Sequence, residues 1–191
     1  MPKLYFRYGT MSSSKTANLL MVAHNYKLQG KKVLLIKPFI DDRFGDKIKS
    51  RCGLESDVEY LLKKEDSDLS ELNKHILNDL DAILVDEAQF LTKEQVDKLR
   101  KISYIIPILC YGLRSDYKTN LFEGSKRLLE IADTIEEIKT TCYFCDKKAI
   151  INVKYKDNII IKNGTDDIDL GTEEKYLCSC YECWDNKNQI F

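Results

Sequence analysis

The apolar positions of the chain follow two alternating periods. Consecutive apolar residues at 33–36, 82–85 and 104–111 are typical of strands buried in a parallel sheet, although Pro107 suggests a bulge or an edge in the last one. Near the N-terminus, Leu4, Phe6 and Tyr8 alternate with more polar neighbours, as in a half-buried strand. Helices are expected from spacing or composition at 17–30, 67–80, 92–102 and 121–132. The alternation predicts an α/β fold with a parallel sheet and helices on its faces.

The pattern changes near residue 140, which divides the chain into an expected domain at 1–139 and a smaller one at 140–191. Two C-x-x-C pairs occur there, Cys142 with Cys145 and Cys180 with Cys183. Residues 150–162 between them read as a hairpin, and residues 163–176 as a loop. Four thiolates from two such pairs predict a tetrahedral, structural zinc site, and the alternative is four buried free cysteines. Cys178 is expected to be free, because C-x-C lacks this pair geometry.

Length and composition limit the domain organisation, the location and the partners that are expected for this protein. The 191 residues suit one α/β domain with a small appendage, and 43% hydrophobic residues are enough for a packed core. There is neither an apolar run long enough for a membrane span nor the apolar core of a signal peptide, so a cytoplasmic protein is expected. A net charge of −1 gives no bulk attraction to nucleic acid. Seven cysteines, an odd number, argue against a disulfide framework.

A phosphate-binding loop is the strongest chemical signal. The first strand leads into GTMSSSKT and then into a helix, which is the layout of such a loop, although Ser14 replaces the usual second glycine. Its backbone N–H groups and the helix N-terminus would hold phosphates, while Lys15 reaches the β- and γ-phosphates and the Thr16 hydroxyl ligates Mg²⁺. The alternative is a Ser-capped helix after an ordinary turn. The candidate residues are Gly9, Thr10, Met11, Ser12, Ser13, Ser14, Lys15 and Thr16.

A second signal is DEAQF at the end of the apolar run 82–85. Asp86 is placed to hold Mg²⁺, directly or through water, and Glu87 is a candidate general base. Ala88 and Gln89 complete this part of the nucleotide site. Such an acidic pair at a strand end is otherwise ordinary polar surface, and the upstream phosphate loop favours the functional interpretation.

The segment 39–56 is charged and lacks periodicity, so it is expected to be a solvated loop. Arg43 and Arg51 nevertheless follow the carboxyl end of a strand, where α/β proteins bind ligands. Each is therefore a candidate phosphate contact. His24 and His75 lie among polar helix positions and are expected at the surface.

Two reaction classes fit these signals. A kinase would use Glu87 to take a proton from a substrate hydroxyl, whereas an ATPase or helicase acting on nucleic acid would use it to activate water. The chain is too short for a second motor domain, and it shows neither a partner-domain arginine finger nor a basic stripe with interleaved aromatics. Phosphoryl transfer to a small molecule is therefore favoured.

Five motifs in order carry a family resemblance: GTMSSSKT, DDRFG, DEAQF, YGLRSDY, and CYFC followed by LGTEEKYLCSCYEC. In these motifs the chain resembles thymidine kinases of the bacterial and cytosolic-vertebrate type over nearly its whole length. The resemblance implies a parallel-sheet domain followed by a zinc-tethered lasso that closes over the nucleoside. It also implies transfer of the γ-phosphate of ATP to the 5′-hydroxyl of thymidine, with deoxyuridine as a poorer substrate.

The resemblance also assigns residue roles. It makes Glu87 the proton acceptor, Arg43 a residue near the phosphates, and Cys142, Cys145, Cys180 and Cys183 the zinc ligands. It further implies inhibition by dTTP and a homotetramer. The chain departs from the family's usual pattern at Ser14, at Tyr117 in place of Phe, and at Gly171–Thr172 in place of Gly-Gly. The resemblance places the walls of the nucleoside pocket at Met11, Phe90, Leu113, Tyr117 and Tyr176.

Overall fold

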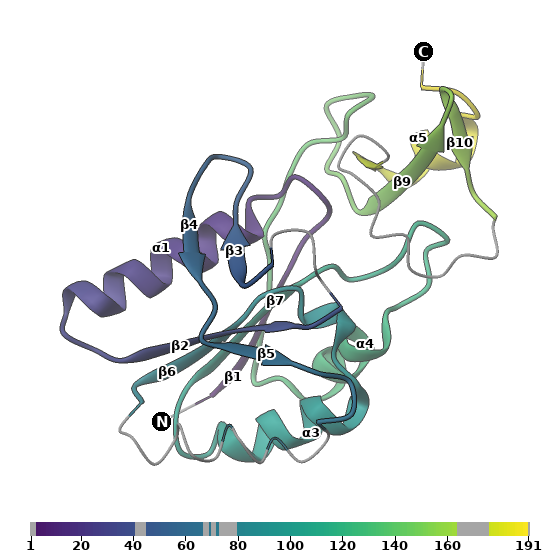
Figure 1. Ribbon diagram of the computed structural model, residues 1–191. Coiled ribbons are helices and arrows are strands. Elements are labelled where there is room, and N and C mark those ends of the chain that lie inside the picture. Colours follow the sequence, from purple (N-terminus) through teal and green to yellow (C-terminus); the bar gives the residue numbers. More distant parts are fainter. Residues whose placement is uncertain are drawn as a thin grey trace.

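A six-stranded parallel sheet forms the centre of the molecule (Figure 1). The structure, a computed structural model, describes residues 3–40, 45–66, 69, 72, 80–163 and 176–190. The order of the strands is β5-β2-β6-β7-β1-β8, so the first strand lies inside the sheet next to β7. The sheet consists of β1 (Leu4–Tyr8), β2 (Val33–Pro38), β5 (Tyr60–Leu62), β6 (Ala82–Val85), β7 (Ile108–Gly112) and β8 (Thr134–Glu137).

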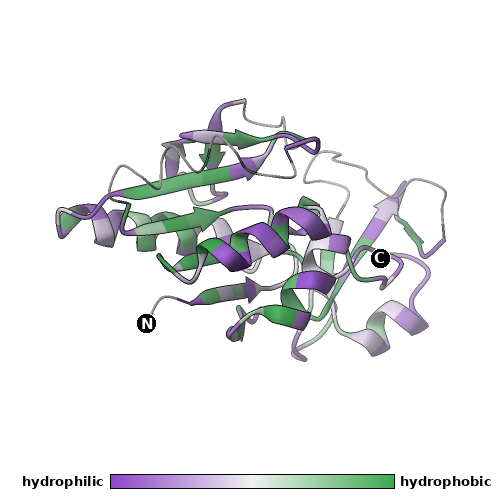
Figure 2. Cartoon of the chain, turned by 90° about the horizontal axis from the view of Figure 1, so that it is seen from below, coloured by the Kyte–Doolittle hydropathy of each residue, from purple (hydrophilic) through white to green (hydrophobic). Residues whose placement is uncertain are grey.

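Helices cover the sheet and bury its two faces. The strands of the sheet are predominantly hydrophobic, while the helices show both hydrophilic and hydrophobic residues (Figure 2). Helix α1 (Lys15–Leu28) packs against one face, with Leu19 and Leu35 completely buried there. The other face packs against η1 (Ala88–Phe90), α3 (Lys93–Ile102) and α4 (Glu123–Ile131). These two cores hold the carboxyl ends of β1, β6 and β7 together, which is where ligands bind in this class of fold.

Two smaller sheets accompany the main one. Strands β3 (Lys47–Lys49) and β4 (Glu55–Asp57) form an antiparallel hairpin, called here the phosphate-side hairpin because of its position beside the predicted phosphate loop. The C-terminal part contains β9 (Ile151–Lys156), β10 (Ile159–Ile161), β11 (Tyr176–Ser179) and α5 (Tyr181–Asn186), and residues 141–190 are called here the cysteine module. Its small core centres on Val153, Ile160 and Ile190.

The structure confirms the parallel sheet, its flanking helices and the hairpin at 150–162. Among the described residues, no helix combines the length and apolar character that a membrane crossing requires. Of the helix expected at 67–80, Leu69 and Leu72 are fully buried, and most of the other residues, including His75, lie outside the described part. Arg43 and Gly171–Thr172 also lie outside it. His24 is exposed, as expected.

Two expectations are wrong. The strand expected at 104–111 begins only at Ile108, and it is central, not an edge. Pro107 precedes it and uses its carbonyl to accept a hydrogen bond from the Ile83 N–H, while Tyr104 and Ile105 are two-thirds exposed. The segment 39–56 is not simply a solvated loop, because it contributes most of the phosphate-side hairpin, with Ile48 buried.

Candidate active site

The phosphate loop connects β1 to α1 and is folded tightly. Its Ser13 N–H donates to the Thr10 carbonyl, and the Lys15 ammonium lies over the loop, 2.7 Å from the same carbonyl oxygen. A Cβ at Gly9 would lie 2.6 Å from the Ile138 carbonyl oxygen, so this position requires glycine. The loop ends where α1 begins, and the helix N-terminus therefore adds its N–H groups to an anion site.

Thr16 and Asp86 come together from different segments, as the sequence predicts for a Mg²⁺ site. The Thr16 hydroxyl lies 3.4 Å from Asp86 Oδ1, and Asp86 is 5% exposed at the end of β6. Burial, and next the charge of Glu87, raise the pKa of Asp86 to about 7. A hydroxyl and a buried carboxylate side by side are oxygen ligands of the kind that Mg²⁺ takes when it accompanies a nucleotide.

Glu87 is held in a defined position. Its backbone is left-handed, with φ 49°, and its carboxylate oxygen Oε2 accepts a hydrogen bond of 2.5 Å from Gln89 Nε2. The other end of the Gln89 amide accepts from the Leu113 N–H at 2.9 Å. A Cβ at Gly112 would lie 2.7 Å from Gln89 Oε1, so the glycine makes room for this bridge. Gln89 is 2% exposed and acts as a support for Glu87 and Leu113.

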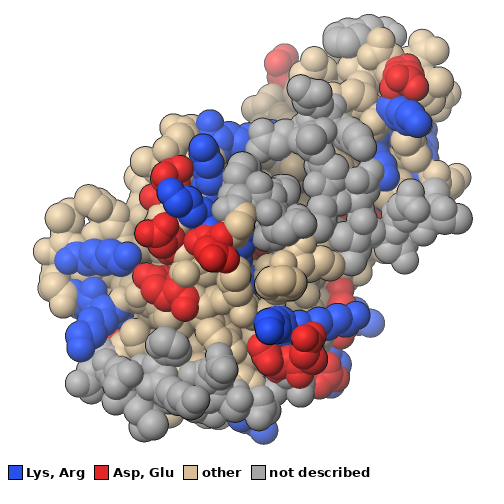
Figure 3. Space-filling view, in the orientation of Figure 1, with Lys and Arg blue, Asp and Glu red and all other residues tan. Residues whose placement is uncertain are grey.

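A cleft of about 190 Å³ joins these groups. One side is the phosphate loop and the start of α1, and the other is the phosphate-side hairpin, whose residues 47–52 line it. Arg51 donates a hydrogen bond to the Ser12 hydroxyl, which supports its prediction as a residue near the phosphates. Charges of both signs alternate over the hairpin (Figure 3), where Glu55 pairs with Lys47 and Lys49. Asp86, Glu87 and Leu113 complete the lining.

Four cysteines gather in the cysteine module. The sulfur atoms of Cys142, Cys145, Cys180 and Cys183 all lie within 4.8 Å of one another. The Cys145 sulfur is 3.8 Å from that of Cys180 and 3.6 Å from that of Cys183. Four sulfurs at the Zn–S bond length of about 2.3 Å in a tetrahedron stand about 3.8 Å apart, so the cluster fits a metal such as zinc.

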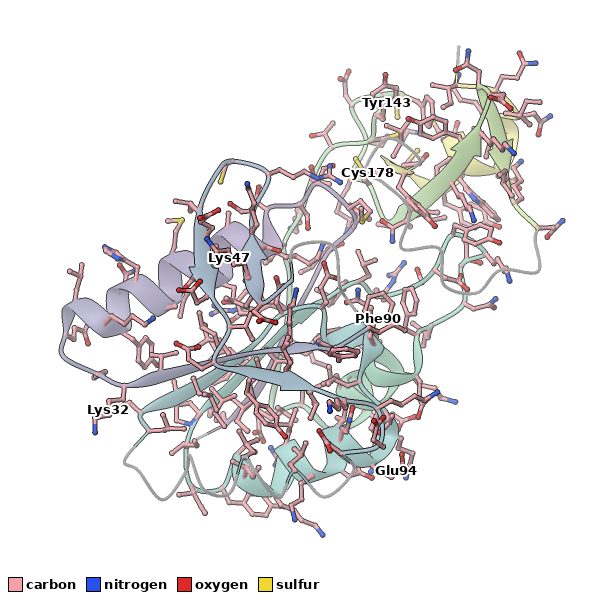
Figure 4. The ribbon with its side chains drawn as sticks, viewed as in Figure 1. Lys32, Lys47, Phe90, Glu94, Tyr143 and Cys178 are labelled. Atoms are coloured by element: carbon pink, nitrogen blue, oxygen red, sulfur yellow. The ribbon has the colours of Figure 1, made fainter. Side chains whose placement is uncertain are left out.

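Cys178 lies outside this cluster, as the sequence predicts. Its thiol donates to the Thr141 carbonyl at 3.3 Å, and burial raises its pKa. It stays within the cysteine module (Figure 4) but points its sulfur to the backbone.

Known proteins resemble the chain over nearly its whole length. The family model described as thymidine kinase matches residues 2–184. The chain belongs to the thymidine kinase family. It is 43% identical to the thymidine kinase of Haemophilus influenzae, over 94% of each chain. It is 41% identical to that of Lactiplantibacillus plantarum, also over 94% of each chain, and 40% identical to that of Encephalitozoon cuniculi, over 96% of this chain and 87% of the relative.

A solved helicase structure resembles the chain weakly. A Pif1 helicase from Candida albicans matches with a TM-score of 0.42 and 11% identity. The match covers 72% of this chain and 36% of the helicase. A likeness at this level carries no argument about function. Because the chain belongs to the thymidine kinase family, the alternative of an ATPase acting on nucleic acid is not favoured.

The family resemblance assigns five residues to the walls of the nucleoside pocket, and two of them line the cleft. Met11 and Leu113 line the cleft, whereas Phe90, Tyr117 and Tyr176 are not among the described residues that line it. Phe90 packs edge-on against Phe122 with ring centres 5.8 Å apart, and it lies between the hairpin and α3 (Figure 4). Tyr117 is 3% exposed, with the Lys154 ammonium 5.1 Å from its ring centre. All five assignments to the nucleoside pocket stay predictions.

Several residues of the site were not predicted from the sequence. Lys47, Lys49, Ser50 and Cys52 line the cleft from a segment that reads as an irregular charged loop. Asn152 is a second case, because its side chain contacts the phosphate loop from the cysteine module. Asn152 interrupts the otherwise apolar run 150–153. Because a polar side chain buried in a strand needs hydrogen-bond partners, this pattern could have indicated its contact.

Ser14 permits a first prediction. It adopts φ 62°, a left-handed conformation that costs a non-glycine residue about 1–2 kcal/mol. Ser14→Gly removes this cost and preorganises the loop, so the KM for ATP is expected to fall roughly two- to fivefold in initial-rate assays. Asn158→Gly is the matched control, because Asn158 has φ 64° in the β9–β10 turn of the cysteine module. An equal change of the KM in both variants would contradict the prediction.

Proposed function

We propose that this protein transfers the γ-phosphate of ATP to the 5′-hydroxyl of thymidine and so forms dTMP. The observation that supports this most directly is the joint position of Lys15, Thr16, Asp86 and Glu87 at one cleft. Membership of the thymidine kinase family indicates ATP and thymidine as the two substrates. Deoxyuridine is expected to be a poorer substrate, since a methyl pocket discriminates by only about 1–3 kcal/mol.

In the proposed mechanism, the phosphate loop binds the phosphates through its N–H groups and Lys15. Thr16 and Asp86 would hold Mg²⁺, which neutralises charge on the phosphates. Glu87, oriented by Gln89, accepts the proton of the attacking hydroxyl. Arg51 and, by family resemblance, Arg43 add positive charge near the phosphates. Met11, Leu113, Phe90, Tyr117 and Tyr176 are proposed to surround the base.

The test is release of ADP with Mg²⁺ and ATP, measured with thymidine, with other nucleosides, with single-stranded DNA and with no acceptor. Release that depends on thymidine and equals the dTMP formed would support the proposal. Release that DNA stimulates and thymidine does not would contradict it. That second outcome would favour the ATPase alternative.

The cysteine module is proposed to bind one structural Zn²⁺ through Cys142, Cys145, Cys180 and Cys183. The ion would join the segment around Cys142 to the segment that begins α5, and so fix the module's fold. Because the small core of this module shares no residue with the cores of the main sheet, we also propose a domain boundary between residues 139 and 140. We also propose that the protein is a homotetramer and that it is located in the cytoplasm.

The end product of the pathway, dTTP, is proposed as an inhibitor that occupies the nucleoside pocket and the phosphate loop together. The cleft supports this, because Met11 and Leu113 line it beside the loop. We expect dTTP inhibition to be relieved by raising thymidine or ATP in steady-state assays. Inhibition that neither substrate relieves would contradict this prediction.

A further inference from the structure

The side chain of Asn152 bridges three segments that lie far apart in the sequence. It is located on β9 and is 4% exposed. Its Oδ1 accepts a hydrogen bond from the Met11 N–H at 2.7 Å, and its Nδ2 donates to the Ser115 carbonyl at 3.0 Å. Both polar atoms of the amide are therefore used, one on the phosphate loop and one on the loop after β7.

Asn152 is itself anchored in the cysteine module. It is paired with Cys178 of the neighbouring strand β11. Cys178 comes two residues before Cys180, which belongs to the metal cluster. The Ile150 N–H donates to the Ser179 carbonyl, and the Ile150 carbonyl accepts from Arg114. The position of Asn152 thus depends on the pairing of β9 with the strand that leads into the cluster.

The bond to Met11 matters because the loop is strained immediately after it. Ser12 and Ser14 both have φ 62°, so two left-handed serines lie within three residues of Met11. Such a conformation persists only where surrounding contacts enforce it. The Met11 N–H is directed to Asn152 and not into the cleft, so its bond fixes the loop from outside and leaves later N–H groups for phosphates.

We propose that Asn152 is a positioning residue through which the cysteine module holds the phosphate loop in its ATP-binding shape. The inference rests on the proposed function only in taking ATP as the loop's ligand. It gives the metal cluster an effect on ATP binding in addition to its proposed role around the nucleoside.

Asn152→Ala removes both hydrogen bonds. The dissociation constant for ATP, measured by calorimetry with Mg²⁺ and without thymidine, is expected to rise roughly tenfold. Metal content should stay at the wild-type level, which separates loss of positioning from loss of the module's fold. Asn188→Ala is the matched control, since Asn188 is an exposed asparagine of the same module. It should bind ATP as the wild type does.

A rescue experiment distinguishes positioning from a general structural defect. Ser14→Gly relieves part of the loop's strain, so it is expected to improve ATP affinity by a larger factor in the Asn152→Ala protein than in the wild type. An equal or smaller improvement in the Asn152→Ala protein would overturn the proposal. So would an Asn152→Ala protein with wild-type ATP affinity.

The wild-type protein provides a test that needs no variant. The Met11 and Ser13 amides are hydrogen-bonded, to Asn152 and to Thr10. Their hydrogen exchange without substrates is expected to accelerate at least tenfold when a chelator removes the metal. Exchange that is indifferent to the chelator would overturn the proposal. These readouts involve no phosphoryl transfer, so a wild-type protein that forms no dTMP would contradict the proposed function and leave this result standing.

Discussion

Glu87→Gln is expected to lower kcat for dTMP formation by roughly 10²–10⁴ and to change the KM for thymidine little. The substitution removes the group that we propose accepts the proton of the attacking hydroxyl. It should leave the position of the side chain intact, because a glutamine oxygen can still accept the hydrogen bond that Gln89 Nε2 donates to Glu87. Steady-state kinetics with saturating Mg²⁺ and ATP measure both constants.

The matched control is Glu94→Gln. Glu94 is exposed in the first turn of α3, on the far side of the sheet from the phosphate-side hairpin (Figure 4), and does not line the cleft. It carries the same change of charge, so its kcat should match the wild type. A Glu87→Gln protein with unchanged kcat would exclude Glu87 as the base. A large rise of the KM alone would instead assign it a binding role.

The parts of the candidate site that the structure brings together, as the sequence predicts, are signalled by short local motifs. Gly9–Thr16 lie between a strand and a helix, and Asp86 ends an apolar run. Parallel strands place both at the same edge of the sheet, where Thr16 lies beside Asp86. The cysteine cluster is similarly local, with each C-x-x-C pair supplying two neighbouring sulfurs.

The elements that were missed carry weak local signals. Strands β5 and β8 form the two edges of the sheet and are only three and four residues long. With sequences YLL and TIEE they lack the long apolar runs of the central strands. The position of Pro107 explains why it is tolerated, since a proline just before a strand loses no hydrogen bond of the ladder.

Contacts between distant segments were beyond the reach of periodicity. The charged residues of the phosphate-side hairpin look like solvated loop until Ile48 is seen buried against α1 and the main sheet. Asn152 reaches Met11 across 141 positions of sequence. Such bonds depend on how the cysteine module lies on the main sheet, and no spacing within either part encodes that placement.

Cys183→Ser is expected to abolish metal binding and to raise the KM for thymidine on the order of tenfold or more. Among the described residues, the core cluster of the module has three buried apolar side chains, which supply about 1.5–3 kcal/mol each. Structural zinc in small domains binds with about 10–16 kcal/mol, so the ion outweighs this core. Strands β10 and β11, which flank residues 162–175, should lose their fixed separation once the metal is absent.

Cys178→Ser is the matched control for this loss of metal. A serine hydroxyl can donate to the Thr141 carbonyl as the Cys178 thiol does, and the four cluster sulfurs are untouched. This variant should keep about one metal per chain and a wild-type KM for thymidine, as measured by elemental analysis and initial rates. If Cys183→Ser retains full metal, the four-cysteine assignment is wrong. If it loses metal with no change in either substrate's KM, the cluster stabilises the module without organising the active site.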